Sequence, residues 1–183
     1  MIPQLAKEFN QLQQQLDALL QQVKPFTHQQ QNFKPGGTSW SMLQICRHLI
    51  QSETQINKYL RKKILGAGKV EQAGVRAFFR SLVLTIAMRL PLKYKVPDAI
   101  AVDLAEDYSY EVLSADWKAL RTEIRDFLES VDEANAKKEL FRHPLLGKMS
   151  LVQGLRFMNE HVARHSRQLE RILEHPDFAK LAS

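Results

Sequence analysis

Four stretches of the chain carry apolar residues at alternating steps of three and four positions. They span residues 2–23, 42–59, 113–131 and 151–172. Such steps keep the apolar side chains on one face of a helix, which is typical of helices packed in a bundle. No comparable stretch alternates with a period of two. The pattern therefore predicts an all-α fold, a four-helix bundle without a sheet.

Capping residues mark where the helices begin. Ser41 and Ser150 are each followed three positions later by a glutamine, Gln44 and Gln153, which is the spacing of a capping box. In such a box the serine oxygen accepts a hydrogen bond from a backbone amide, and the glutamine reaches back to the cap. Ser114 is the expected cap of the third helix.

The connection between the second and third helices is long, about residues 66–112. Apolar residues inside it predict a short extra helix that ends near Pro91, namely Val75, Phe79, Leu82 and Ile86. A connection of this length can cross the bundle, so that the second and third helices run parallel. With 183 residues, the chain suits a single domain over residues 1–183.

Composition narrows the class of protein. The chain is 44% hydrophobic and 25% charged, which is globular composition. Its one cysteine, Cys46, excludes an intramolecular disulfide framework and a cysteine-based zinc cluster. The longest apolar run, residues 82–88, is far shorter than the roughly 20 residues of a membrane helix. No targeting segment is visible, so we expect a cytoplasmic protein with no membrane partner.

Charge is unevenly distributed along the chain, which carries a net charge of +6. Residues 58–95 hold ten Lys/Arg against Glu71 alone, about +9, whereas residues 98–133 hold eleven Asp/Glu against three basic residues, about −8. A nucleic-acid binder usually shows a basic face without such an acidic neighbour, so nucleic acid is not the expected partner. We interpret the two segments as solvated and as attracting each other within the fold or across a dimer.

Three histidines have the spacing of a metal site. His161 and His165 stand four residues apart, on one face of the fourth helix, and His165 lies on its apolar stripe. Imidazoles turned toward a core are costly unless their nitrogens are satisfied, and a pair at this spacing can chelate a divalent ion. His48 is the best third ligand. It lies seven residues past Ser41, a depth that faces His165 if the two helices are antiparallel.

Three neutral imidazoles would leave coordination positions open for water or substrate. Zinc and nickel are the first candidate ions, with iron or manganese as alternatives, because imidazole suits several divalent metals. Two histidines at this spacing also occur as ordinary hydrogen-bonded residues. A site without metal therefore stays open on the pattern alone.

Three further polar residues are candidates for supporting the metal or touching the substrate. Gln168, one turn after His165, could hydrogen-bond an imidazole or a ligand, or could be a polar interface residue. Ser52, one turn after His48, could leave room beside the metal. Glu53 could act as a general base. It lies about 140° around the helix from His48, however, which favours an exposed or ion-paired role.

Two aromatic residues and the cysteine are assigned to packing. Trp40 lies beside the second helix cap and Trp117 on the third apolar stripe, so we expect both in the core. Cys46 lies about 200° around the helix from His48 and is expected to be a small buried residue, not the thiol of a site.

Two signatures resemble those of a known family. Residues 40–49 followed by Glu53 resemble the first signature of the DinB/YfiT-like superfamily, and residues 143–147, Ser150 and residues 161–168 resemble the second. The resemblance implies a four-helix bundle with up-down-down-up topology, often a homodimer. It also implies a divalent metal on three histidines, which match His48, His161 and His165.

Family members include metal-dependent hydrolases and transferases that use low-molecular-weight thiols. We therefore expect a metal-dependent enzyme acting on an unidentified small molecule, either a hydrolase or a thiol transferase. Either reaction suits a three-histidine ion, which could ionise a bound water or hold a thiol as thiolate. The alternative is a non-catalytic, metal-stabilised bundle that acts as an interaction module. The basic insertion over residues 58–95 leaves the substrate open, because such loops shape pockets.

Overall fold

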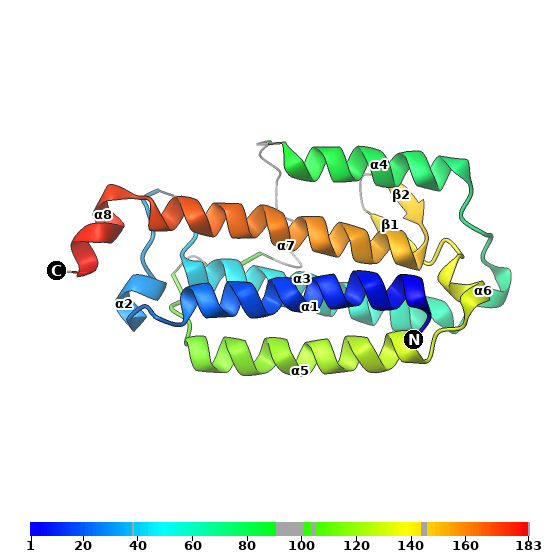
Figure 1. Cartoon of the computed structure of the whole chain (residues 1–183), viewed down its shortest axis with the longest axis horizontal. Coiled ribbons are helices and arrows are strands. Elements are labelled where there is room, and N and C mark those ends of the chain that lie inside the picture. The colour runs from blue at the N-terminus through cyan, green and yellow to red at the C-terminus, as the bar shows by residue number, and fades with distance from the viewer. Residues whose placement is uncertain (38, 91–100, 104, 144–145, 183) are drawn as a thin grey trace.

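Four long helices lie side by side and form the bundle: α1 (Pro3–Val23), α3 (Met42–Ile64), α5 (Tyr110–Glu129) and α7 (Leu151–Leu173). The computed structural model describes residues 1–37, 39–90, 101–103, 105–143 and 146–182. α1 and α7 run in one direction, and α3 and α5 run in the other (Figure 1). The predicted all-α bundle with up-down-down-up topology is therefore confirmed, and α3 lies antiparallel to α7.

Shorter elements connect the bundle helices: α2 (His28–Gln31), η1 (Ala67–Lys69), α4 (Val75–Arg89), α6 (Glu133–Ala136), β1 (Phe141–His143), β2 (Gly147–Met149), α8 (Pro176–Ala179) and η3 (Lys180–Ala182). Of these, α4 is the extra helix predicted in the crossover. It packs along α7, outside the four-helix bundle (Figure 1). Among the described helices, none combines the length and apolar character needed to cross a membrane.

The face that α4 buries differs from its apolar stripe. The large apolar residues that predict this helix are exposed, among them Phe79, Leu82 and Ile86. The buried face consists of Ala77, Ser81, Leu84 and Met88. Periodicity identifies a helix here but not its orientation, because a mixture of small and apolar residues packs against α7.

A small sheet contradicts the prediction of a fold without one. β1 and β2 pair antiparallel, with Phe141 opposite Met149 and His143 opposite Gly147. Gly147 has φ +83°, a conformation that favours glycine because it has no Cβ. Each strand has only three residues, too few for a period of two to stand out in the sequence.

The helix caps agree with the sequence at two positions and differ at a third. Ser41 and Ser150 form the predicted capping boxes of α3 and α7. Ser114 does not cap α5. Instead, the hydroxyl of Ser109 accepts a hydrogen bond from the backbone N–H of Val112, one turn before the apolar stripe begins. The prediction of Ser114 was wrong because it took the beginning of the apolar stripe as the beginning of the helix. The first turn of α5 comes before that stripe and has an exposed outer side, so apolar residues do not reveal it.

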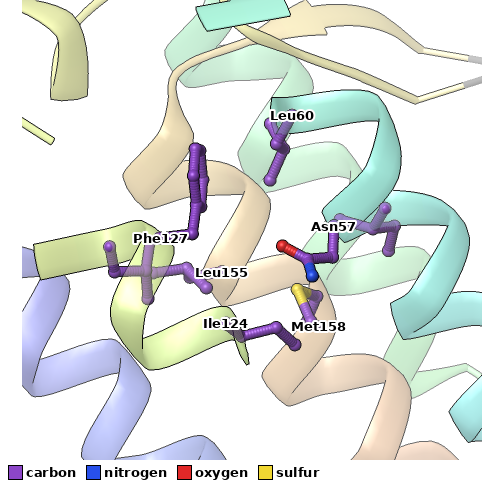
Figure 2. A pocket seen from close by; sticks show the side chains of 8 residues that line it. Asn57, Leu60, Ile124, Phe127, Leu155 and Met158 are labelled. Atoms are coloured by element: carbon purple, nitrogen blue, oxygen red, sulfur yellow. The ribbon is translucent and has the colours of Figure 1, made fainter. Parts of the chain in front are cut away.

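The core is closely packed where α3, α5 and α7 meet. Figure 2 shows the amide of Asn57 among apolar side chains at this junction. The cavity there measures only about 10 Å³, roughly the space of one water molecule. Its lining consists of Ile56, Asn57, Leu60, Ile124, Phe127, Leu128, Leu155 and Met158. At this junction the bundle fills its own interior and leaves room for no ligand larger than a water molecule.

The basic segment over residues 58–95 finds its ionic partners outside the acidic one. Arg80 lies 3.9 Å from the carboxylate of Glu139. Arg89 pairs with Glu160 on α7. Neither glutamate belongs to residues 98–133. One interpretation of the charge pattern was that the basic and acidic segments attract each other within the fold. These two ion pairs do not provide evidence for that attraction.

Candidate metal centre

Antiparallel packing of α3 and α7 brings the three predicted histidines together. The Nε2 atoms of His48 and His161 are 3.3 Å apart, and those of His165 and His161 are 3.1 Å apart. The ligand nitrogens of all three rings lie within 4.8 Å of one another. His48 and His165 are buried, whereas His161 is partly exposed. In the described part of the chain, no Asp, Glu or Cys joins this cluster.

The three nitrogens cannot satisfy one another through hydrogen bonds. A neutral imidazole nitrogen carries either one proton or one in-plane lone pair. The Nε2 of His161 faces two other ring nitrogens and can make a proper bond to only one of them. A cation accepts all three lone pairs at once. Two nitrogens at about 2.05 Å from a tetrahedral zinc lie about 3.3 Å apart, which matches the two separations from His161. The donor set and its spacing therefore fit a divalent metal.

Gln168 orients one of the rings. Nδ1 of His165 donates to the side-chain oxygen of Gln168 at 3.0 Å. This bond places the proton on Nδ1 and leaves the lone pair on Nε2, the nitrogen that faces His161. The interaction predicted from the spacing of the two residues is present.

Aromatic rings enclose the cluster on two sides. Trp40 stacks on His165 with ring centroids 6.0 Å apart and planes 16° apart, and it lies 4.7 Å from His48. Phe157 stacks on His161 at 5.6 Å and 10°. The prediction that Trp40 packs in the core is incomplete, because its partly exposed ring covers the histidines. Sequence reasoning missed Phe157, although its position four residues before His161 places both on one helix face.

Burial keeps two rings of the cluster, those of His161 and His165, uncharged. Burial, followed by the charge of His48, lowers the pKa of His165 to about 3, and the Gln168 hydrogen bond acts in the opposite direction. Burial, followed by His165 and His48, lowers the pKa of His161 well below its usual value. Both rings are therefore neutral near pH 7, the state in which imidazole binds a metal.

Arg164 adds positive charge beside the cluster. Its guanidinium contributes to the lowered pKa of both His161 and His165. It also donates to the backbone carbonyls of Met88 and Leu90, at 3.3 and 2.8 Å. The same side chain thus ties the end of α4 to α7 and sets a cation near the histidines. An anion at this site would be favoured.

Glu53 faces away from the cluster. Its carboxylate accepts two bonds from the guanidinium of Arg121, at 2.7 and 2.8 Å, and one from the indole N–H of Trp117, at 3.0 Å. All three side chains are buried. The ion-paired role favoured by its helical position is present, and the exposed role is not. A carboxylate engaged in this way on the α5 side of α3 is not placed to take a proton at the histidines.

The remaining candidates are ordinary residues of α3. Ser52 is buried one turn after His48, and its role as a spacer beside a metal stays a prediction. Cys46 is also buried, and burial raises the pKa of its thiol to about 12. A thiol in this environment is protonated at neutral pH, which agrees with its assignment to packing.

Comparison with known protein families identifies the family of this chain. A family model described as the DinB superfamily matches residues 11–169, most of the chain and all three histidines of the cluster. No curated protein matches, and no solved structure does either. Since the matched region contains all four bundle helices in whole or in large part, this chain belongs to the DinB superfamily.

Proposed function

We propose that His48, His161 and His165 hold a divalent metal ion through their Nε2 atoms, and that this site makes the protein a metal-dependent enzyme. The observation that carries the proposal is the convergence of three imidazole nitrogens, with His161 Nε2 3.3 Å from that of His48 and 3.1 Å from that of His165, an arrangement that hydrogen bonds among these rings cannot satisfy in full. Zinc or nickel is the first choice of ion, and iron or manganese the second, because imidazole binds all of these.

The number of protein ligands, three histidines, supports a catalytic role for the ion over a purely structural one. Structural zinc sites are usually closed by four protein ligands, whereas catalytic sites have three and an open position. When bound, the ion would supply Lewis acidity, lowering the pKa of a water or thiol at that open position.

The protein's own residues would prepare the site for an anionic nucleophile. Gln168 holds the ring of His165, and Trp40 and Phe157 limit the access of bulk water to the rings. Limited water strengthens electrostatic interactions at the site. The charge of Arg164 favours hydroxide or thiolate over their neutral forms. An anionic nucleophile of either kind agrees with the two reactions that the DinB superfamily suggests, hydrolysis or transfer of a low-molecular-weight thiol to an electrophile.

Metal content and activity test this proposal together. Purified protein should carry close to one equivalent of metal by elemental analysis, and His48→Ala and His165→Ala should carry little. His28→Ala is the matched control, since His28 is exposed on α2, away from the cluster. Ester and amide substrates would report hydrolysis. Cysteine or glutathione with chlorodinitrobenzene would report thiol transfer.

Three outcomes are informative. Activity that disappears on chelation, returns on reloading and survives in His28→Ala would support the enzyme. Metal that raises only the melting temperature, with every substrate inert, would favour the non-catalytic, metal-stabilised bundle. Equal metal content in the wild type and the cluster variants would refute the site itself.

A further inference from the structure

The outer side of α4 carries an exposed apolar stripe. Seven large apolar residues in and just after this helix are between 44% and 72% exposed: Val75, Phe78, Phe79, Leu82, Val83, Ile86 and Leu90. They recur at helical spacing and so form one continuous stripe, here named the α4 face. The helix lies on the outside of the molecule with α7 on its other side (Figure 1). At about 200 Å² for each fully exposed large side chain, the α4 face offers roughly 700 Å², more than the largest apolar patch of a typical monomer, about 300–600 Å².

Every charged residue of α4 is positive. The helix contains Arg76, Arg80 and Arg89 and no aspartate or glutamate. At 3.6 residues per turn, Arg76 and Arg80 lie along one edge of the α4 face and Arg89 lies along the other. Arg80 and Arg89 pair with Glu139 and Glu160, whose side chains are only 17% exposed, against 38% and 65% for the two arginines. Both edges of the α4 face therefore present cations to solvent, with their carboxylate partners set further inside.

Two more cations without a recessed partner add to one of these edges. Arg76 is exposed, and no ion pair in the described part of the chain includes it. Arg80 donates a hydrogen bond to the backbone carbonyl of Lys148 at 3.1 Å, which places this exposed lysine of β2 beside α4. The partner that covers the α4 face must therefore be apolar in the middle and negatively charged along its edges.

An anionic lipid bilayer has this combination of properties. A helix that lies flat in the headgroup layer inserts its apolar side among the acyl chains and keeps its arginines at the level of the phosphates. The α4 face has the matching order, with phenylalanine and aliphatic side chains between two arginine edges. A second copy of the chain fits less well, because an antiparallel crossing of two α4 helices would set Arg76 of one against Arg89 of the other.

We propose that the α4 face binds the surface of a bilayer that contains anionic phospholipid, with α4 lying parallel to that surface. At 1.5 Å per residue, the 15 residues of α4 extend about 22 Å along the bilayer. The expectation of no membrane partner rested on the search for targeting and spanning segments, and a helix that lies on the surface requires neither. This proposal is independent of the metal and of any activity.

Sedimentation with lipid vesicles tests it. The wild type should sediment with vesicles of phosphatidylcholine mixed with phosphatidylglycerol far more than with phosphatidylcholine alone, and added salt should reduce binding. Ile86→Glu places a negative charge at the centre of the α4 face, and Val112→Glu places the same charge on α5, in the bundle layer away from α4; the two residues are 52% and 58% exposed. Ile86→Glu should weaken binding by about 100-fold, because it removes buried apolar area and adds a charge that phosphatidylglycerol repels. Val112→Glu should bind like the wild type.

A second pair of variants tests the arginine edge. Arg76→Gln should weaken binding by about 5-fold, the usual effect of one basic residue near an anionic membrane, and Lys118→Gln, at an exposed site on α5, should not. Circular dichroism checks that all four variants are folded.

A tryptophan probe reports which surface enters the lipid. Phe79→Trp should shift its emission to shorter wavelength on the mixed vesicles and be quenched by brominated acyl chains. Val112→Trp should do neither beyond the signal of Trp40 and Trp117, which the wild type supplies.

Three results would overturn the proposal. They are a wild type that does not sediment with the mixed vesicles at low salt, an Ile86→Glu protein that binds as tightly as Val112→Glu, and equal binding to the neutral and the mixed vesicles. Light scattering identifies the alternative occupant: a wild-type dimer that Ile86→Glu dissociates, without vesicle binding, would reassign the α4 face to a second copy.

Discussion

Gln168 accepts a 3.0 Å hydrogen bond from Nδ1 of His165, one turn earlier on α7. The opposite nitrogen of the same ring lies 3.1 Å from Nε2 of His161. One side chain outside the histidine cluster therefore determines which nitrogen of His165 is available to a metal.

Removal of this hydrogen bond should weaken metal binding without unfolding the protein. In Gln168→Leu, the ring of His165 loses the hydrogen bond that fixes its orientation and its tautomer. Loss of such a bond typically lowers metal affinity by about 10- to 100-fold. Gln168→Glu retains an acceptor and should stay within a few-fold of the wild type. Competition with a chromophoric chelator measures both affinities. Equal affinity in Gln168→Leu would contradict the orienting role.

Metal-free protein should lose stability in mild acid because of the buried histidines. The pKa of His165 is about 3 in the folded state against about 6.5 in an unfolded chain, so the unfolded chain binds more protons between these values. The stabilising effect of its burial as a neutral ring is intact above pH 6.5 and declines as the pH falls toward 3. His165 alone should remove about 2 kcal/mol between pH 7 and pH 5.

Urea denaturation at pH 7 and pH 5 measures this effect. His165→Gln should reduce the difference in free energy of unfolding between the two pH values, and His28→Gln, at an exposed site, should leave it unchanged. An identical pH dependence in His165→Gln and the wild type would show that the ring is not buried as a neutral group.

Glu53 should matter for stability and not for metal content. Glu53→Gln leaves the buried guanidinium of Arg121 without its counter-charge, and breaking a buried pair in this way costs about 3–5 kcal/mol. The double substitution to Met at both positions should recover most of that loss, because both charges are removed together. Urea denaturation gives the free energies. A Glu53→Gln protein with unchanged stability but no activity would instead point to the general-base role.

Replacement of Gly154 by alanine should lower the stability of the protein. A Cβ at this position on α7 would lie 2.8 Å from Cγ and 3.0 Å from Cβ of Phe141 on β1. Alanine favours a helix over glycine by about 1 kcal/mol, yet the clash should outweigh this and give a net loss of about 1–2 kcal/mol. Thermal unfolding of Gly154→Ala, alone and combined with Phe141→Ala, separates the two effects. A more stable Gly154→Ala would mean that the hairpin moves aside at little cost.

Much of the candidate site follows from local rules. The capping boxes at Ser41 and Ser150 set the depth of each histidine along its helix, and a helix rises by a constant amount per residue. Counting from these caps places His48 opposite His165 once the helices are antiparallel. The hydrogen bond from His165 to Gln168 follows from the same periodicity.

Other features depend on contacts between distant segments. The hairpin of β1 and β2 is too short to leave a period, and the aromatic cover comes from Trp40, which no spacing relates to His165. The side of α4 that faces α7 was decided by which residues fit that helix, and small ones such as Ala77 fit better than Phe79. Glu53 is paired rather than exposed because α5 brings Arg121 to it.

The sequence by itself determined the helices, their starts and the spacing of the histidines, because hydrogen bonding and amphipathicity act over three or four residues. Only the tertiary structure decided that three rings meet, which carboxylate is buried and which apolar face is left outside. Those outcomes depend on packing between segments far apart in the chain, and no local pattern encodes such a separation. His48 and His161, for example, are 113 residues apart.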